Sequence, residues 1–200
     1  MTIYLLSGLG AGEEIFKYLK FPYPTVFIPW IDHVKNESLN DYAMRMTKAI
    51  DTSKPFILIG VSFGGIVAQE IATKITPEKV IIISSLKTPQ EIPWYVRYSA
   101  QLNLFRFLPN EAIRKGRKVA HFFFGAVKKG EKKFLDEIIS VINVPYLKWS
   151  LQKIGNWEGA SIKSPLIHIH GTTDILFPKS NLSNVDYWIE GGRFIVMQKA

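Results

Sequence analysis

The fold is decided by residues 56–69, which read FILIGVSFGGIVAQ. The stretch opens on an uncharged apolar run, Phe56–Ile59, which is typical of a strand buried on both faces of a parallel sheet. A segment of helix-forming residues, Ile66–Ala72, follows, and Pro77 predicts where that helix ends. Ser62 therefore lies on a tight strand-to-helix turn, where the glycines on either side allow the backbone to approach closely.

The Gly-x-Ser-x-Gly turn at Gly60–Gly64, with this strand before it and this helix after it, resembles the nucleophile elbow of the α/β-hydrolase superfamily. The resemblance implies that Ser62 is a nucleophile and that the amide of Phe63 donates to the oxyanion formed during acyl transfer. The loop after the first expected strand would then supply the second oxyanion amide, that of Leu9. A structural serine in a glycine-rich turn is the alternative interpretation.

Further apolar runs alternate with helix-forming segments along the chain. The expected strands cover residues 2–7, 26–30, 56–61, 80–83, 165–171 and 185–189. The expected helices cover residues 13–19, 41–50, 66–72, 135–142 and 146–154, and a last helix is expected to begin within 191–200. This order predicts an α/β fold with a mostly parallel sheet of about six strands.

The strand pattern is missing from residues 86–158, which are rich in aromatic and basic side chains. The resemblance implies a helical cap inserted between two strands of an α/β-hydrolase core. We therefore expect a core of residues 1–85 and 159–200, with residues 86–158 as the cap. Some of the cap's aromatic side chains are expected to line an apolar acyl pocket.

Asp174 follows a buried strand in the order His170-Gly171-x-x-Asp, which resembles the acid-bearing segment of the superfamily. A plain turn residue is the alternative for Asp174. In this superfamily the catalytic histidine comes last, but no histidine follows Asp174. Similar sequences usually carry it in a Gly-Gly-(x)-His-Phe context, and this chain has Gly191-Gly192-Arg193-Phe194, so the resemblance implies that Arg193 stands at the position of the usual histidine. An arginine stays protonated and cannot take a proton from Ser62.

Three explanations of the missing base are open. In the first, the chain has lost hydrolase activity and binds a ligand or performs altered chemistry. In the second, another histidine serves as the base. In the third, the C-terminus is altered or shortened. The best substitute bases are His33, in a loop after a strand, and His121, in the cap. His168 and His170, on an expected buried strand, are weaker candidates.

The composition narrows the classes of protein. The chain has 200 residues and no cysteine, which excludes disulfides and thiolate chemistry, and we expect one cytoplasmic domain without a signal peptide or membrane span. The formal charge is +8, and much of it lies in one part of the expected cap. Its basic residues there are Arg106, Arg114, Lys115, Arg117, Lys118, Lys128, Lys129, Lys132 and Lys133. We favour a solvated basic face over a site for an anionic partner, and we expect no nucleic acid.

The sequence supports a dinucleotide site and a metal site less well than a serine-hydrolase site. The glycine-rich loop Gly8–Gly12 follows a strand, but residue 13 is a glutamate, so the Gly-x-Gly-x-x-Gly pattern of a dinucleotide site is not met. A metal cluster of His168, His170 and Asp174 would need an open sheet face, whereas a central strand is buried on both sides. We expect neither a cofactor nor a metal.

The resemblance thus implies a cofactor-free serine hydrolase that acts on a small-molecule ester or related acyl substrate, as a carboxylic-ester hydrolase. The alternative is a catalytically impaired protein of the same fold that binds a small ligand or a protein partner. A basic module for an anionic surface is a third interpretation, and its binding would weaken steeply with salt.

Overall fold

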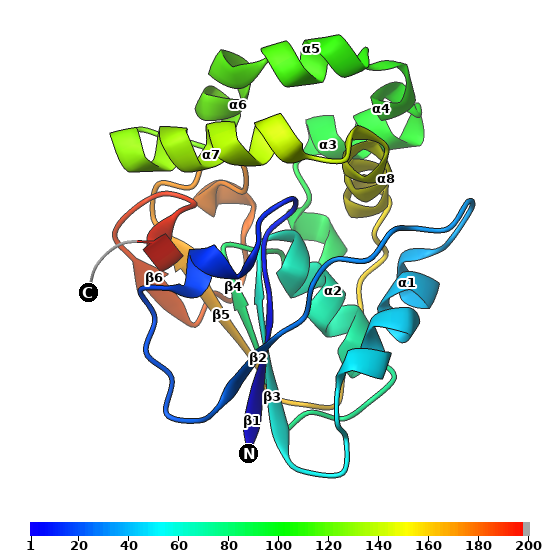
Figure 1. Ribbon diagram of the computed structural model, residues 1–200, viewed down its shortest axis with the longest axis vertical. Coiled ribbons are helices and arrows are strands. Elements are labelled where there is room, and N and C mark those ends of the chain that lie inside the picture. The colour runs from blue at the N-terminus through cyan, green and yellow to red at the C-terminus, as the bar shows by residue number, and fades with distance from the viewer. Residues whose placement is uncertain (198–200) are drawn as a thin grey trace.

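The computed structural model describes residues 1–197 and contains one six-stranded sheet with the strand order β2-β1-β3-β4-β5-β6 (Figure 1). The strands are β1 (Thr2–Leu6), β2 (Thr25–Phe27), β3 (Phe56–Val61), β4 (Lys79–Ile83), β5 (Leu166–Gly171) and β6 (Tyr187–Ile189). Every neighbouring pair is parallel. The α/β class and the six strands expected from the sequence are confirmed, and the described sheet is fully parallel.

The central strands β1, β3 and β4 are largely apolar because both faces of the sheet are covered there. Successive side chains of a strand point to opposite faces, so Ile3 and Leu5 enter one core layer while Tyr4 and Leu6 enter the other. The helices α1 (Leu39–Met46) and α2 (Phe63–Ala72) cover the face of Tyr4 and Leu6 (Figure 1). Short 3₁₀ turns and helix α7 (Lys129–Val141) contribute to the layer on the other face.

Several expected elements are shorter in the structure. The helix expected over residues 13–19 is a single 3₁₀ turn, Glu13–Phe16. The strand expected over residues 26–30 ends at Phe27, and beyond it Trp30 turns its indole N–H to the carbonyl of Gly8, 3.2 Å away. The last expected helix is a 3₁₀ turn, Ile195–Met197, and residues 198–200 lie outside the described part.

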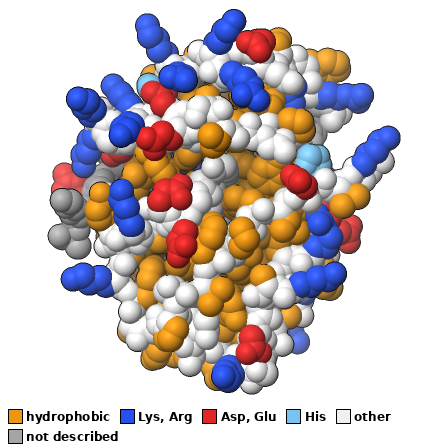
Figure 2. All heavy atoms as spheres, in the orientation of Figure 1, with side chains coloured by type: hydrophobic (Ala, Val, Ile, Leu, Met, Phe, Trp, Pro, Cys, Tyr) orange, Lys and Arg blue, Asp and Glu red, His pale blue; other side chains and the backbone are white. Residues whose placement is uncertain are grey.

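The chain between β4 and β5 is helical and lies over the carboxyl edge of the sheet (Figure 1). Its α-helices are α3 (Trp94–Gln101), α4 (Leu104–Phe107), α5 (Asn110–Lys115), α6 (Arg117–Phe123), α7 (Lys129–Val141) and α8 (Val144–Gly155). The helices expected over 135–142 and 146–154 correspond to α7 and α8. Basic side chains are scattered over the outer surface of these helices, with acidic and apolar side chains between them (Figure 2). Within residues 1–197 no helix is long and apolar enough to span a membrane.

The elbow turn requires glycine at position 64. A Cβ placed on Gly64 would collide with the backbone carbonyls of Leu6 and Ser7, and these atoms cannot move without shifting β1. We expect Gly64→Ala to lower the free energy of unfolding by about 1–3 kcal/mol.

Gly130→Ala is the matched control, because no atom lies within 4 Å of an added Cβ there. In helix α7 that change is expected to be neutral or to stabilise by up to about 1 kcal/mol. Urea unfolding of both variants checks the prediction, and equal effects of the two changes would contradict it.

Candidate active site

Ser62 lies at the carboxyl end of β3, directly before α2, in a strained backbone conformation with φ 56° and ψ −121°. Surrounding hydrogen bonds hold this conformation. The amide of Ser62 donates to the carbonyl of Ile83 at 2.9 Å, while its own carbonyl accepts from Gly65 N at 3.0 Å and from the Ser85 hydroxyl at 2.6 Å. Strain of this kind costs about 1–3 kcal/mol and persists only where neighbours enforce it. The turn is therefore built to present the Ser62 side chain.

The amides of Leu9 and Phe63, predicted as oxyanion donors, have no protein acceptor within residues 1–197. A Cβ added at Gly8 would lie 3.5 Å from Ser62 Cβ, and the next residue, Leu9, lines the same cavity as Ser62. Phe63 is the first residue of α2, so its amide has no carbonyl to bond within the helix. Both amides are thus unpaired in the described part of the chain, and their role as oxyanion donors stays a prediction.

Asp174 is buried at the end of the loop that follows β5. Its Oδ1 accepts the amides of Leu176 at 2.9 Å and Phe177 at 3.1 Å, which is the hydrogen bonding of a turn residue. Its Oδ2 lies 3.3 Å from His170 Nε2 and 3.1 Å from Arg193 Nη1. Asp174 therefore shapes its loop and also meets the side chain at position 193.

Arg193 bridges Ser62 and Asp174. Its Nη1 donates to Asp174 Oδ2 at 3.1 Å, and its Nη2 donates to Ser62 Oγ at 2.5 Å. The guanidinium packs over the ring of Phe177, 4.5 Å from the ring centre, and Arg193 is only 5% exposed. Burial lowers the pKa of Arg193 while Asp174 opposes that change. The structure thus brings Ser62, Asp174 and Arg193 together in one row, with a cation between the hydroxyl and the carboxylate.

The two best substitute bases have other partners. The ring of His33 stacks on Trp149 with centroids 5.1 Å apart and planes 20° apart. His121 Nε2 lies 2.9 Å from Asp136 Oδ1, in a pair between α6 and α7. Within the described chain neither histidine contacts Ser62.

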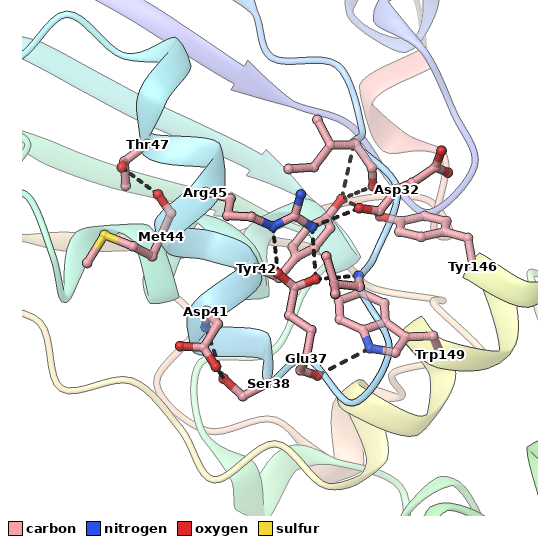
Figure 3. Close-up of polar contacts among 12 residues, drawn as sticks. Asp32, Glu37, Ser38, Asp41, Tyr42, Met44, Arg45, Thr47, Tyr146 and Trp149 are labelled. Carbon is pink, nitrogen blue, oxygen red and sulfur yellow. Dashed lines mark hydrogen bonds and ion pairs between the residues drawn. The ribbon is translucent and has the colours of Figure 1, made fainter.

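The loop that carries His33 is tied down on both sides of it (Figure 3). The Tyr42 hydroxyl donates to the carbonyl of Ile31 at 2.9 Å. Arg45 donates to the carbonyl of Asp32 at 2.7 Å and pairs with Glu37 at 2.6 Å. These contacts fix the loop against α1 and explain why His33 packs on α8 and not on Ser62.

His168 and His170 form a buried pair on β5. His168 Nε2 and His170 Nδ1 are 3.0 Å apart, and His170 Nε2 lies 3.1 Å from the carbonyl of Phe177. Burial, with the neighbouring His170, lowers the pKa of His168 to about 3. Among residues 1–197 no three His, Asp or Glu side chains gather as metal ligands. His170 Nε2 also lies 3.3 Å from Asp174 Oδ2, the oxygen that accepts from Arg193.

An apolar cavity of about 140 Å³ opens beside Ser62 and Arg193. Its apolar lining comes mainly from the first loop, from α5, α6 and α7, and from the end of the chain. It includes Leu9, Ile15, Ile113, Ala120, Phe124, Phe134, Ile138, Ile142 and Phe194. Figure 2 shows apolar side chains in a hollow on one face of the molecule, below the basic outer helices. From the sequence we expected aromatic residues to line this pocket, but the part of the lining that comes from α7 is largely aliphatic. The spacing of these aliphatic residues along the helix is the same as that of residues that simply pack against a protein core.

Acid is expected to weaken the protein through Asp174. Burial alone would raise the pKa of this carboxyl, but the charge of Arg193 and the hydrogen bond of His170 hold it below its ordinary value. The unfolded carboxyl titrates near about 3.9, so the stability from this group is present above about pH 4 and is lost as the pH falls through the lower folded pKa. Urea unfolding between pH 2 and pH 6 should show a steeper acid loss in the natural chain than in Asp174→Asn. Parallel curves would contradict the prediction.

The parallel sheet, the strained serine turn before α2 and the helices over the carboxyl edge define the α/β-hydrolase fold. No protein-family model matches the chain, and no curated protein gives a significant sequence match.

Three solved structures illustrate what the chain is similar to. A lipase-esterase related protein from Clostridium acetobutylicum has a TM-score of 0.68 at 16% identity, over 98% of this chain and 88% of that one. A thermophilic esterase from Thermogutta terrifontis has a TM-score of 0.69 at 12% identity, over 100% and 85%. An esterase from Rhodococcus sp. has a TM-score of 0.64 at 16% identity, over 99% and 85%. These likenesses establish the α/β-hydrolase fold of the chain.

Proposed function

We propose that this chain is a serine-hydrolase-type protein that binds a small apolar ester or related acyl compound beside Ser62 and turns it over slowly. The observation that carries the proposal is the hydrogen bond from Arg193 Nη2 to Ser62 Oγ, with Asp174 on the other side of the guanidinium. A cation occupies the place between serine and carboxylate that a general base takes in a serine hydrolase.

The contacts of Arg193 with Ser62 and Asp174 explain why turnover is expected to be slow. Attack by Ser62 Oγ on an ester carbonyl forms a carbon–oxygen bond, converts the carbonyl π bond into an oxyanion and releases the hydroxyl proton. Arg193 is already protonated and cannot accept that proton, so it must go to water. Collapse of the oxyanion then breaks the ester bond and expels an alkoxide, which takes a proton from water. The amides of Leu9 and Phe63 would still stabilise the oxyanion, and the apolar cavity would still hold the acyl group. Binding and part of the transition-state stabilisation are kept, while base catalysis is lost.

A specific observation also favours a second candidate, an efficient serine ester hydrolase. Ser62 has a strained backbone with φ 56°, and such strain concentrates at working catalytic sites. This candidate needs a base that reaches Ser62 after a rearrangement, because His33 and His121 have other partners in the structure.

The proposal includes the division of the chain. Residues 86–158 act as a cap over a core of residues 1–85 and 159–200. The helices α3–α8 lie over the carboxyl edge of the sheet (Figure 1), and Ala120 and Ile138 of this segment line the cavity beside Ser62.

Steady-state hydrolysis of p-nitrophenyl hexanoate at pH 7 tests the proposal. We expect the natural chain to accelerate hydrolysis by no more than about 10³- to 10⁴-fold over water, the level left by binding and an oxyanion hole alone. A kcat/KM within the usual enzyme range of about 10⁴–10⁸ M⁻¹s⁻¹, lost in Ser62→Ala, would support the efficient hydrolase instead.

A further inference from the structure

Several hydrogen-bond donors at the Ser62 end of the cavity have no acceptor within residues 1–197. Arg193 donates two of its N–H groups to Asp174 and Ser62. Its other N–H groups have no acceptor side chain or carbonyl within residues 1–197. Ser62 Oγ accepts from Arg193, so the hydroxyl hydrogen remains to be donated. The amides of Leu9 and Phe63 also lack an acceptor in this part of the chain. This end of the cavity therefore calls for a ligand that only accepts hydrogen bonds.

Both carboxylate oxygens of Asp174 already have partners. Asp174 receives the amides of Leu176 and Phe177 on one oxygen, and Arg193 and His170 meet the other. It lies behind the guanidinium as seen from Ser62, because Arg193 bridges the two. The carboxylate keeps Arg193 in place without filling the donor end of the cavity.

The remainder of the cavity is apolar and small. Its volume of about 140 Å³ is close to the ~150 Å³ of an apolar protein cavity known to hold benzene. Aliphatic and aromatic side chains such as Ile138, Ile142 and Phe134 line it. An apolar group of about six carbons fits this space.

We propose that the physiological ligand is a monocarboxylic acid with a short apolar tail, bound as the anion, with its carboxylate on Ser62 and Arg193 and its tail in the cavity. This assignment rests on the proposed function, because it places the ligand in the same site. A carboxylate has two oxygens that accept only, and hydrogen bonds to a charged group are about twice as strong as neutral ones. The amino end of α2 also favours negative charge at Ser62. A neutral ester or alcohol would leave more of these donors unpaired.

Hexanoate is the probe, and its matched comparison is 1-hexanol, which has the same tail without the charge. Isothermal titration at pH 7 should show saturable hexanoate binding to the natural chain, at least about 10-fold tighter than 1-hexanol. Arg193→Met should weaken hexanoate by about 10- to 100-fold and leave 1-hexanol nearly unchanged. Equal affinity for the two probes in the natural chain, or no saturable hexanoate binding, would overturn the proposal.

A second pair of variants tests the cavity without touching Arg193, in case Arg193→Met fails to fold. Ala120→Trp fills the cavity from α6 and should abolish hexanoate binding. Ala112→Trp places the same side chain on an exposed position of α5 outside the cavity lining and should leave binding intact. Loss of binding in both variants, or in neither, would contradict this location of the ligand.

The two proposals fail in different ways. If hexanoate does not bind while ester turnover is slow, the carboxylate ligand is wrong and the proposed function stands. If ester turnover by the natural chain is fast and depends on Ser62, the proposed function is wrong whatever hexanoate does.

Discussion

Arg193→His is expected to raise the rate of ester hydrolysis by at least about 100-fold, and up to about 10⁴-fold, because general base catalysis contributes that much. Arg193 Nη1 now lies 3.1 Å from Asp174 Oδ2. The shorter imidazole must move toward Asp174 to bind this oxygen, and it then offers Ser62 an acceptor for its proton. The measurement is kcat/KM for p-nitrophenyl hexanoate.

The control for this prediction is Arg193→Gln, which removes the charge and supplies no base. The second control is Ser62→Ala in both backgrounds. Residues that act as a catalytic unit are strongly non-additive, so Ser62→Ala should cost much less in the natural chain, where no base activates the serine, than in Arg193→His, where it should remove the whole gain. A rate for Arg193→His no higher than that for Arg193→Gln would contradict the prediction.

Imidazole added in solution can supply the missing base without depending on the reach of a new side chain. Arg193→Gly removes the guanidinium that now contacts Ser62, and free imidazole can occupy that space. We expect imidazole to accelerate hydrolysis in Arg193→Gly with saturation, and to have no such effect on the natural chain. A linear dependence on imidazole, equal in both proteins, would show that no base site exists there.

Asp174→Ala is expected to lower the free energy of unfolding by about 3–5 kcal/mol, because removing one partner of a buried ion pair leaves the other charge unpaired. Asp174 and Arg193 are both buried, and Asp174 also holds the amides of Leu176 and Phe177. Urea unfolding measures the change.

The matched control is Glu137→Ala, which breaks the exposed Lys133–Glu137 pair of α7, where the charged atoms are 3.8 Å apart. Surface pairs of this kind contribute less than about 1 kcal/mol. The double variant with Asp174→Leu and Arg193→Met should recover much of the lost stability, since a buried pair can be replaced by apolar groups at little cost. A loss of less than about 1 kcal/mol in the free energy of unfolding of Asp174→Ala would contradict the expected contribution of the Asp174–Arg193 pair.

The sequence indicated the parts of the site that are local in the chain. The turn around Ser62 could be predicted because strand, glycines and helix follow one another directly, and its conformation depends on those neighbours. Asp174 was found in the same way, from the strand before it. The position of Arg193 at the usual place of the histidine followed from the two glycines before it.

What the sequence could not provide depends on contacts between distant segments. The bridge from Arg193 to Ser62 joins residues 131 positions apart, so no local pattern reports it. His33 lies in a loop of the expected kind, yet its ring is taken by Trp149 of a helix far along the chain. The cavity likewise depends on how α7 lies against the first loop, which hydrophobic periodicity does not specify.

The turn that presents Ser62 and the loop that carries Asp174 are encoded locally, whereas the contacts of Arg193 with both residues appear only in three dimensions. Arg193 keeps Asp174 paired and Ser62 hydrogen-bonded.

The most direct test of the central claim is the rate at which a fluorophosphonate probe modifies Ser62 at neutral pH, read by mass spectrometry, with Ser62→Ala as the control. The probe requires an activated serine and an oxyanion hole but no knowledge of the ligand. We predict slow or no modification of the folded natural chain and rapid modification, confined to Ser62, in Arg193→His. Rapid modification of Ser62 in the natural chain would contradict the claim that Arg193 leaves this serine without a base.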